Sequence, residues 1–329
     1  MSKVHPLTAS AALAAVLLVM GLAAWNGNGQ EKDKGEAGTV QLGPNASLGG
    51  RRAFPDDNLW NKDISQSPVD AHSDRYIASI GTDAPLHPDF GPPYHGEPNG
   101  IPYVVVPGKQ KRVPVTFRYA SDSDPGPYPI PPDAPIEGGP NAKEGDRHVL
   151  IIDRDNWMLY ELFAAEHKGN QWRAGSGAIF DMKVNKFRPA GLTSADAAGL
   201  PVFPGLVRYD EVFELKEIRH ALRFTAKRTR KAYVHPARHY ASNSRDPNRP
   251  PMGMRVRLKA DYDISGFSAN AQIILKALKK YGMFLADNGG NWYFSGVPDD
   301  RWDNEELATL KRVKGKDFEV IQLGRLVTQ

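Results

Sequence analysis

The 329-residue sequence contains no cysteine. This absence excludes disulfide bonds, thiolate metal sites, cysteine nucleophiles and lipid attachment through a cysteine. A chain without disulfides must be stabilised by its hydrophobic core, and 40% hydrophobic residues over this length can supply one. The composition therefore indicates a globular protein whose chemistry does not use thiols.

Excess charge and familiar cofactor motifs are also missing. The net charge is only +4, from 42 basic and 38 acidic residues, and no arginine-rich helix or zinc-finger spacing accompanies it. We therefore expect no nucleic-acid partner. The sequence has no G-x-S-x-G elbow, no H-E-x-x-H, no Walker loop and no dinucleotide fingerprint. These absences disfavour serine hydrolases of that type, zinc proteases and nucleotide-dependent enzymes, and we expect no cofactor.

A single long apolar run is present, at residues 7–24, after a short basic start at Lys3. Small residues at Gly21, Ala23 and Ala24 suit a signal peptidase, so residues 1–24 are predicted to be a signal peptide. The run is long enough that an uncleaved membrane anchor is the alternative. In both cases we expect the rest of the chain to be secreted, periplasmic or on the cell surface, with membrane contact only through this segment if it is uncleaved.

Composition divides the remaining chain into two parts. Residues 25–52 are rich in Gly, Asn and charge and show no apolar periodicity, which predicts a flexible linker. Residues 53–329 contain no second linker, which predicts a single globular β-rich domain.

Short apolar runs between Pro- and Gly-rich loops dominate this domain and predict strands. The runs at 148–153 and 158–164 flank a turn-like segment and predict a β-hairpin. Helices are expected at 194–198, 269–281 and 304–312. We therefore expect an antiparallel β-sandwich, jelly-roll-like, with long Pro/Gly loops and two or three short helices. The other predicted strands are 101–106, 113–119, 177–182, 218–226, 255–260, 284–287 and 292–296.

Two predicted strands carry arginines at alternate positions. Arg219 and Arg223 share one face of the predicted strand at 218–226, and Arg255 and Arg257 share one face of the predicted strand at 255–260. If these faces adjoin, they form a basic stripe able to hold carboxylates or sulfates of an acidic polymer. The alternative is an ordinary solvated sheet face. His220 lies on the apolar face, where a core histidine is the alternative to a catalytic one.

Hydrolysis of a glycosidic bond needs two carboxylates on opposite sides of the bond. The sequence does not choose the pair, because the separations in space are unknown. A lyase would instead need a base such as His220 or Tyr240, with Arg223 or Arg257 neutralising a uronate. The carboxylates in loops or at strand ends are Asp122, Asp124, Glu137, Asp181, Asp196, Asp210 and Glu211. From this set we select as catalytic candidates Asp124, Glu137, Asp181 and Asp210, together with His220.

Aromatic side chains near Gly/Pro loops and strand ends suggest sugar stacking, although core packing explains them equally well. The predicted substrate-binding set is Arg223, Arg257, Tyr128, Tyr240 and Trp292. His235 and His239 are four residues apart, but Pro236 lies between them and no third ligand is adjacent. They are weak candidates, and we expect no metal.

Three strings resemble those of a family of uncharacterised secreted bacterial proteins: DPGPYPIPPDAPIEGG, RPAGLTSADAAGLPVFPGLVRYDEV and LADNGGNWYFSG. The resemblance covers roughly residues 54–320 and implies a stand-alone extracellular domain, but no activity. We expect an extracellular carbohydrate-active enzyme, a glycoside hydrolase or polysaccharide lyase, whose partner is a polysaccharide or cell-envelope glycan. The alternative is a non-catalytic carbohydrate-binding or structural module of the cell surface.

Overall fold

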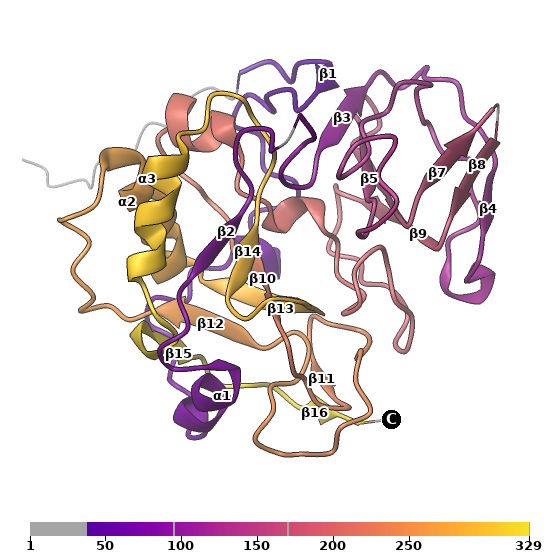
Figure 1. The fold of residues 1–329 in the computed structure, drawn as a ribbon. Coiled ribbons are helices and arrows are strands. Elements are labelled where there is room, and N and C mark those ends of the chain that lie inside the picture. The colour runs from indigo at the N-terminus through magenta and orange to yellow at the C-terminus, as the bar shows by residue number, and fades with distance from the viewer. Residues whose placement is uncertain (1–37, 95, 170, 329) are drawn as a thin grey trace, which may run out of the picture. The chain divides into compact units, whose positions relative to one another are not determined.

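Two larger β-sheets and two small ones organise the part of the chain that the computed structural model describes, residues 38–94, 96–169 and 171–328 (Figure 1). The five-stranded sheet has the order β1 (Gly43–Pro44), β3 (Tyr103–Val106), β5 (Val149–Asp153), β6 (Met158–Phe163), β9 (Ser176–Asp181). The six-stranded sheet has the order β15 (Phe318–Val320), β12 (Arg255–Leu258), β13 (Met283–Asn288), β10 (Leu222–Ala226), β14 (Tyr293–Ser295), β2 (His87–Asp89). The small sheets are β4 (Val115–Phe117), β8 (Gln171–Ala174), β7 (Glu166–Lys168) and β11 (Tyr233–Val234), β16 (Leu326–Val327).

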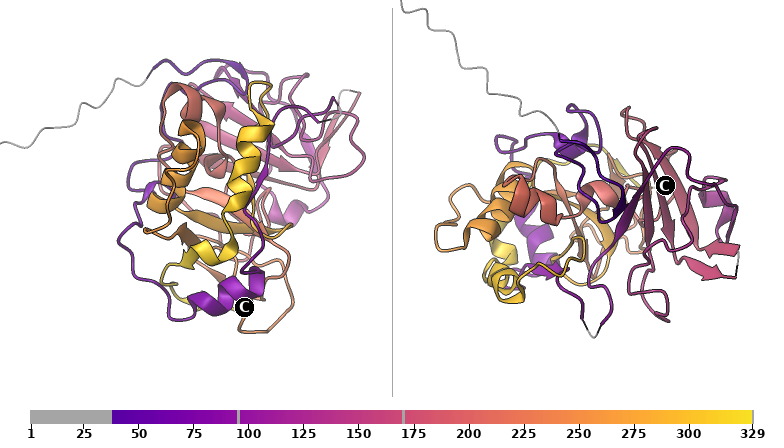
Figure 2. Two further views of the ribbon diagram at one scale, coloured as in Figure 1. Left: turned by 60° about the vertical axis from the view of Figure 1, so that its left-hand side comes forward. Right: turned by 90° about the horizontal axis from the view of Figure 1, so that it is seen from above.

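Within the described residues three α-helices accompany the sheets: α1 (Ser73–Ile80), α2 (Ala269–Lys280) and α3 (Asn304–Thr309). The side chain of Ser268 accepts a hydrogen bond from the Ala271 N–H and so caps α2, which contacts β12 and α3 (Figures 1 and 2). The other turns of helix are η1 (Leu59–Asn61), η2 (Ala120–Asp122), η3 (Phe203–Gly205), η4 (Asp210–Glu214), η5 (Leu310–Arg312) and η6 (Gly315–Asp317).

The expectation of many strands and few helices is confirmed, and β5 and β6 form the predicted antiparallel hairpin. The sheets are mixed, however, because β3/β5, β10/β13, β14/β2 and β4/β8 pair in parallel. A jelly-roll arrangement therefore stays a prediction. The predicted helices at 269–281 and 304–312 are present as α2 and as α3 with η5. The predicted helix at 194–198 is wrong, because turns replace it and the Ser194 hydroxyl accepts the Asp196 N–H at 2.9 Å.

The burial of strand β5 explains why the sequence is continuously apolar over its first four residues. Leu150 and Ile152 pack into the main core, whereas Val149 and Ile151 pack into a second core that includes Tyr128. Both faces of the strand are buried, so no polar residue is needed at alternate positions. The five-stranded sheet therefore lies between two apolar layers.

The arginine-bearing strands are buried too, so the predicted solvated face is wrong. Arg223, Arg255 and Arg257 are at most 8% exposed. Arg255 donates to the carbonyl oxygens of Tyr281 and Leu59 at 2.8 and 2.9 Å. Such acceptors replace water around each guanidinium, which is why an arginine can occupy a buried strand position.

The start of the fold also differs from the expectation. Gly43 pairs with Val105 of β3, and Leu48 is fully buried. Residues 38–52 therefore belong to the folded unit and are not part of a linker. The predicted signal peptide at 1–24 and the rest of the predicted linker lie outside the described residues. Within residues 38–94, 96–169 and 171–328, no helix is long and apolar enough to cross a membrane.

Candidate functional site

Arg223 lies on β10 in the interior of the six-stranded sheet and is 4% exposed. Its Nη1 donates to the hydroxyl of Ser295 on β14 at 2.7 Å, and its Nη2 donates to Asp196 Oδ2 at 3.2 Å. Its Nε is buried and has no hydrogen-bond partner among the described residues. The buried positive charge attracts carboxylates from several segments, and we call the group Asp196, Arg223, Asp287, Glu137 and His148 the Arg223 cluster.

A β-bulge places Asp287 in this cluster. β10 and β13 pair in parallel, with Phe224 opposite Leu285 and Thr225 opposite Asp287, so Ala286 is the extra residue. Bulges re-aim side chains and are common beside active sites. Asp287 Oδ2 accepts the Ala197 N–H at 3.4 Å, which brings the carboxyl next to the segment that carries Asp196.

Glu137 and His148 form the second part of the cluster, and His148 directly precedes β5. His148 Nδ1 lies 2.6 Å from Glu137 Oε2, and His148 Nε2 lies 2.9 Å from the carbonyl oxygen of Ala195. Both ring nitrogens face acceptors, so both carry protons and the imidazole is charged. Burial disfavours that charge, but the Glu137 carboxylate outweighs it and raises the pKa of His148 to about 9.

The segment 193–203 joins the two sheets at this site. Ser176 of β9 donates to the Ser194 carbonyl oxygen at 2.7 Å, and the Ala198 N–H donates to the Ala286 carbonyl oxygen at 3.0 Å. Glu161 of β6 accepts the N–H groups of Val202 and Phe203 at 2.8–3.0 Å. Bonds to both sheets fix this segment, and with it Asp196.

An open pocket of about 330 Å³ adjoins the cluster, which contributes Asp196 and Asp287 to its lining. Among the described residues its lining includes no lysine or arginine, and we call it the acidic pocket. Aromatic rings of Tyr119 and Phe163 line it together with hydroxyl groups, so it offers both stacking surfaces and hydrogen bonds. The carboxylates that line it are Asp122, Asp146, Asp196 and Asp287.

The carboxyl groups around Arg223 differ in proton affinity. For Glu137, burial is outweighed by the charge and hydrogen bonds of His148, so its pKa lies below the ordinary value. For Asp287, burial raises the pKa, and the charge of Arg223 offsets only part of the rise. Burial likewise raises the pKa of Asp196 to about 7, despite Arg223. One site thus holds carboxyl groups whose environments favour opposite protonation states.

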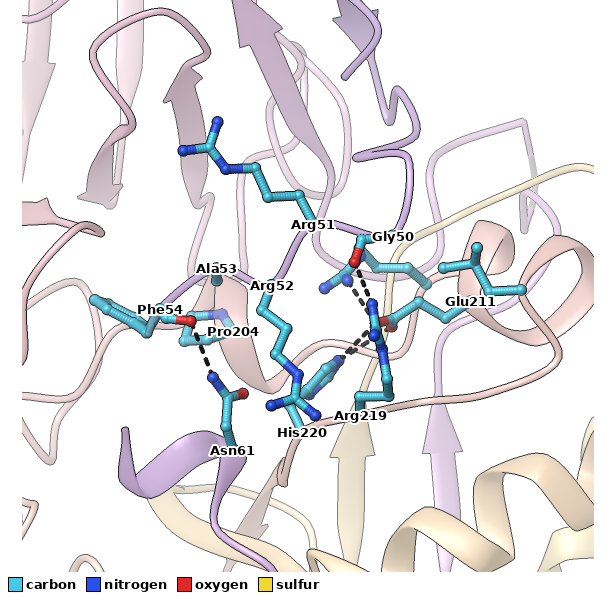
Figure 3. Close-up of a pocket in the computed structure, with 12 residues that line it drawn as sticks. Gly50, Arg51, Arg52, Ala53, Phe54, Asn61, Pro204, Glu211, Arg219 and His220 are labelled. Carbon is cyan, nitrogen blue, oxygen red and sulfur yellow. Dashed lines mark hydrogen bonds and ion pairs between the residues drawn. The ribbon is translucent and has the colours of Figure 1, made fainter. Parts of the chain in front are cut away.

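A second buried charge cluster, around Arg208, has less access to solvent than the Arg223 cluster. Arg208 Nη2 donates to Glu211 at 2.5 Å, and His220 Nε2 lies 3.1 Å from the same carboxylate. The hollow beside it holds only about 10 Å³, the volume of about one water. In Figure 3 the Arg52 guanidinium points toward His220, whereas Arg51 points away. We call Arg208, Glu211 and His220 the Arg208 cluster and assign it a structural role, because no ligand larger than a water fits.

Of the sequence-predicted residues, Glu137 and Arg223 lie together in the Arg223 cluster, although neither lines the acidic pocket. The other predicted carboxylates lie elsewhere and are engaged by other groups. Asp124 pairs with Arg188, and the half-buried Asp181 lies 3.4 Å from Lys183. Asp210 is buried and accepts from the Ser47 hydroxyl at 2.9 Å.

The remaining predicted ligand-binding residues do not line the acidic pocket. His220 is 6% exposed in the Arg208 cluster, and Arg257 is paired with Glu319 at 2.7 Å. Tyr128 and Trp292 are fully buried, and the phenol of Tyr128 donates to the Asp124 carbonyl oxygen at 2.7 Å.

Tyr240 and the weak metal candidates also lie outside the acidic pocket. Tyr240 stacks on His239, with ring centroids 5.3 Å apart. His239 Nδ1 lies 3.1 Å from the Ala197 carbonyl oxygen, and His235 contacts the ring of Phe187. Within the described ranges no group of three or more His, Asp or Glu side chains could hold a metal ion, so these two histidines gain no third ligand there.

Sequence reasoning missed Asp287 and His148. Both had a signal, because Asp287 ends an apolar strand and is followed by Asn288-Gly289-Gly290, whereas His148 begins one. Polar residues at the carboxyl ends of parallel strands commonly face a ligand site. That rule could not be applied while all pairings were expected to be antiparallel.

Comparisons of the chain with protein-family models, curated proteins and solved structures found no match. The candidate function therefore depends on the chemistry of the Arg223 cluster and of the acidic pocket.

Proposed function

We propose that the protein is an extracellular glycoside hydrolase that cleaves a polysaccharide in the acidic pocket. The observation that carries this proposal is the opposite displacement of two pKa values around Arg223, with Glu137 below and Asp287 above the ordinary range. Hydrolysis of a glycosidic bond requires one carboxyl group whose environment favours the ionised form and one whose environment favours the protonated form.

Each residue has a definite task in this reaction. Asp287 donates its proton to the glycosidic oxygen as the bond to the anomeric carbon breaks. Glu137 does not line the pocket itself. Held ionised by His148, it acts as the base that takes a proton from the water whose oxygen forms the new bond to the anomeric carbon. Arg223 is a positioning residue, because its charge holds the carboxyl groups of the cluster together.

The lining of the acidic pocket favours a sugar as the ligand. Tyr119 is 45% exposed and can stack on a sugar ring, and the hydroxyls of Ser176 and Thr193 can bond sugar hydroxyls. A lyase is less well supported, because the expected base His220 faces a hollow of only about 10 Å³ and the other, Tyr240, stacks on His239.

The test is to incubate the purified protein with a panel of neutral and acidic polysaccharides and to measure new reducing ends and unsaturated products. We expect reducing ends without near-ultraviolet absorbance, and a loss of kcat of at least about 100-fold in Glu137→Gln and Asp287→Asn. Asp133→Asn is the matched control, because Asp133 is exposed and does not line the acidic pocket.

Unsaturated products would contradict the hydrolase and support the lyase. Wild-type rates in both active-site variants would refute the assignment of these residues. Retention on one polysaccharide without any product would favour the non-catalytic binding module.

A further inference from the structure

A second open pocket, of about 540 Å³, lies beside the acidic pocket. Its lining includes Ile179, Phe180, Lys186, Phe187, Arg188 and Arg238, and we call it the basic pocket. Ile179 and Phe180 belong to β9, the strand whose first residue, Ser176, lines the acidic pocket. One strand therefore runs from one pocket to the other.

Arg188 forms the wall between the two pockets. Its Nε donates to the Thr193 carbonyl oxygen at 2.7 Å, and its Nη2 donates to the Asp122 carbonyl oxygen at 2.9 Å. Thr193 and Asp122 line the acidic pocket, whereas Arg188 and its ion-pair partner Asp124 line the basic pocket. Arg188 therefore connects lining residues of the two pockets directly.

The charges of the basic pocket are not balanced. Its two carboxylates are already paired, Asp124 with Arg188 and Asp181 with Lys183. Within the described part of the chain, Lys186 and Arg238 form no side-chain hydrogen bond or ion pair, and Arg238 Nε is buried without a partner. Two cations thus remain available to an anionic group.

An aromatic ring lies beside these cations. Phe187 is 38% exposed, and its ring packs edge-to-face against His235 with centroids 4.5 Å apart. The contact orients the ring while leaving part of it open to solvent. A flat exposed ring next to cations suits a sugar that carries a negative group.

We propose that the basic pocket is a subsite for a sugar bearing a carboxylate or sulfate, next to the sugar that is bound in the acidic pocket. The acidic pocket has no lysine or arginine among its described lining residues, whereas the unpaired cations of the basic pocket attract an anion, so the two pockets orient the polymer. The inference depends on the proposed function in taking a glycan as the ligand, but it is tested by binding alone.

The test measures Kd by calorimetry for three probes: hexagalacturonate, a sulfated carrageenan hexasaccharide and cellohexaose. Glu137→Gln serves as the background, so that no probe is cleaved. We expect at least one anionic hexamer to bind at least about tenfold more tightly than cellohexaose. Lys186→Gln and Arg238→Gln should each weaken that binding by about tenfold, as expected for loss of a charge-assisted hydrogen bond.

The matched controls are Lys276→Gln on α2 and Arg75→Gln on α1, which remove exposed charges outside both pockets. Phe187→Ala should weaken binding of the preferred hexamer without changing its salt dependence, because it removes stacking and no charge. Preference for the carboxylated or the sulfated hexamer identifies the anionic group.

The proposal is overturned if cellohexaose binds as well as both anionic hexamers, if no hexamer binds, or if the pocket variants bind like the two controls. Charge-dependent binding without any hydrolysis by the wild type would refute the hydrolase and leave the subsite standing. If Lys186→Gln and Arg238→Gln change neither hydrolysis nor binding, the subsite is refuted and the hydrolase is left standing.

Discussion

Replacement of His148 tests the charge balance that keeps Glu137 ionised. The pKa of His148 rises from 6.5 to about 9 on folding, which corresponds to about 3 kcal/mol at about 1.4 kcal/mol per tenfold change in proton affinity. Below pH 6.5 both folded and unfolded chains are protonated, and the stabilisation is complete. As the pH rises toward 9, the unfolded chain has lost the proton, so the stabilisation declines and disappears above that pH.

The assay is urea unfolding, followed by tryptophan fluorescence, at about pH 6 and about pH 9.5. The free energy of unfolding of the wild type should fall between these pH values by about 3 kcal/mol more than that of His148→Gln. Glu137→Gln should abolish the same pH dependence while retaining the imidazole, which covers the case in which His148→Gln does not fold. His72→Gln is the control, because His72 makes no side-chain hydrogen bond to α1. Equal pH dependence in wild type and Glu137→Gln would refute the reasoning.

Three further substitutions test the interior. Arg223→Met should lower the free energy of unfolding by about 3–5 kcal/mol, because Asp196 is left buried and unpaired, and the double variant Arg223→Met/Asp196→Leu should recover part of the loss in urea unfolding. Burial raises the pKa of Glu161 from 4.5 to about 7, so the free energy of unfolding of the wild type should fall as the pH rises from 4.5 to 7. Glu161→Gln should remove this fall in urea unfolding, and an equal fall in the variant would contradict the reasoning. Trp292→Phe should lower the melting temperature, because the indole N–H that donates to the Gly81 carbonyl oxygen at 2.9 Å is lost, while hexamer binding stays unchanged in calorimetry; weaker binding would restore Trp292 as a ligand contact.

Local elements of this fold could be predicted because their signals are local. The hairpin of β5 and β6 follows from two apolar runs and a turn, and α2 follows from its apolar periodicity and the Ser268 cap. The parallel pairing of β10 with β13 could not be predicted, because the partners are far apart in the sequence and nothing in either strand specifies the direction of the other. The expectation of antiparallel sheets failed at such pairings.

The residue types of the site could be predicted from the sequence, but the charged groups with which each residue pairs could not. Glu137 and Arg223 were selected because a carboxylate beside Gly and an arginine on a strand suit sugar chemistry. The same rule selected Asp124 and Asp181, which the fold places with Arg188 and Lys183. Alternation along β10 predicted a solvent-facing Arg223, because the rule assumes that one face of a sheet is wet. That assumption fails for a strand buried on both faces.

The Arg223 and Arg208 clusters show why composition alone does not identify a functional site. Each contains a buried arginine, acidic partners and a histidine paired with a glutamate. A buried ion pair in a closed interior changes only the stability of the fold, since no reactant reaches it. The Arg208 cluster faces a hollow of about 10 Å³, whereas the Arg223 cluster adjoins a pocket of about 330 Å³. The same chemistry becomes available to a ligand only where the fold leaves room for one, and for this reason the proposed reaction belongs to Glu137 and Asp287 and not to Glu211 and His220.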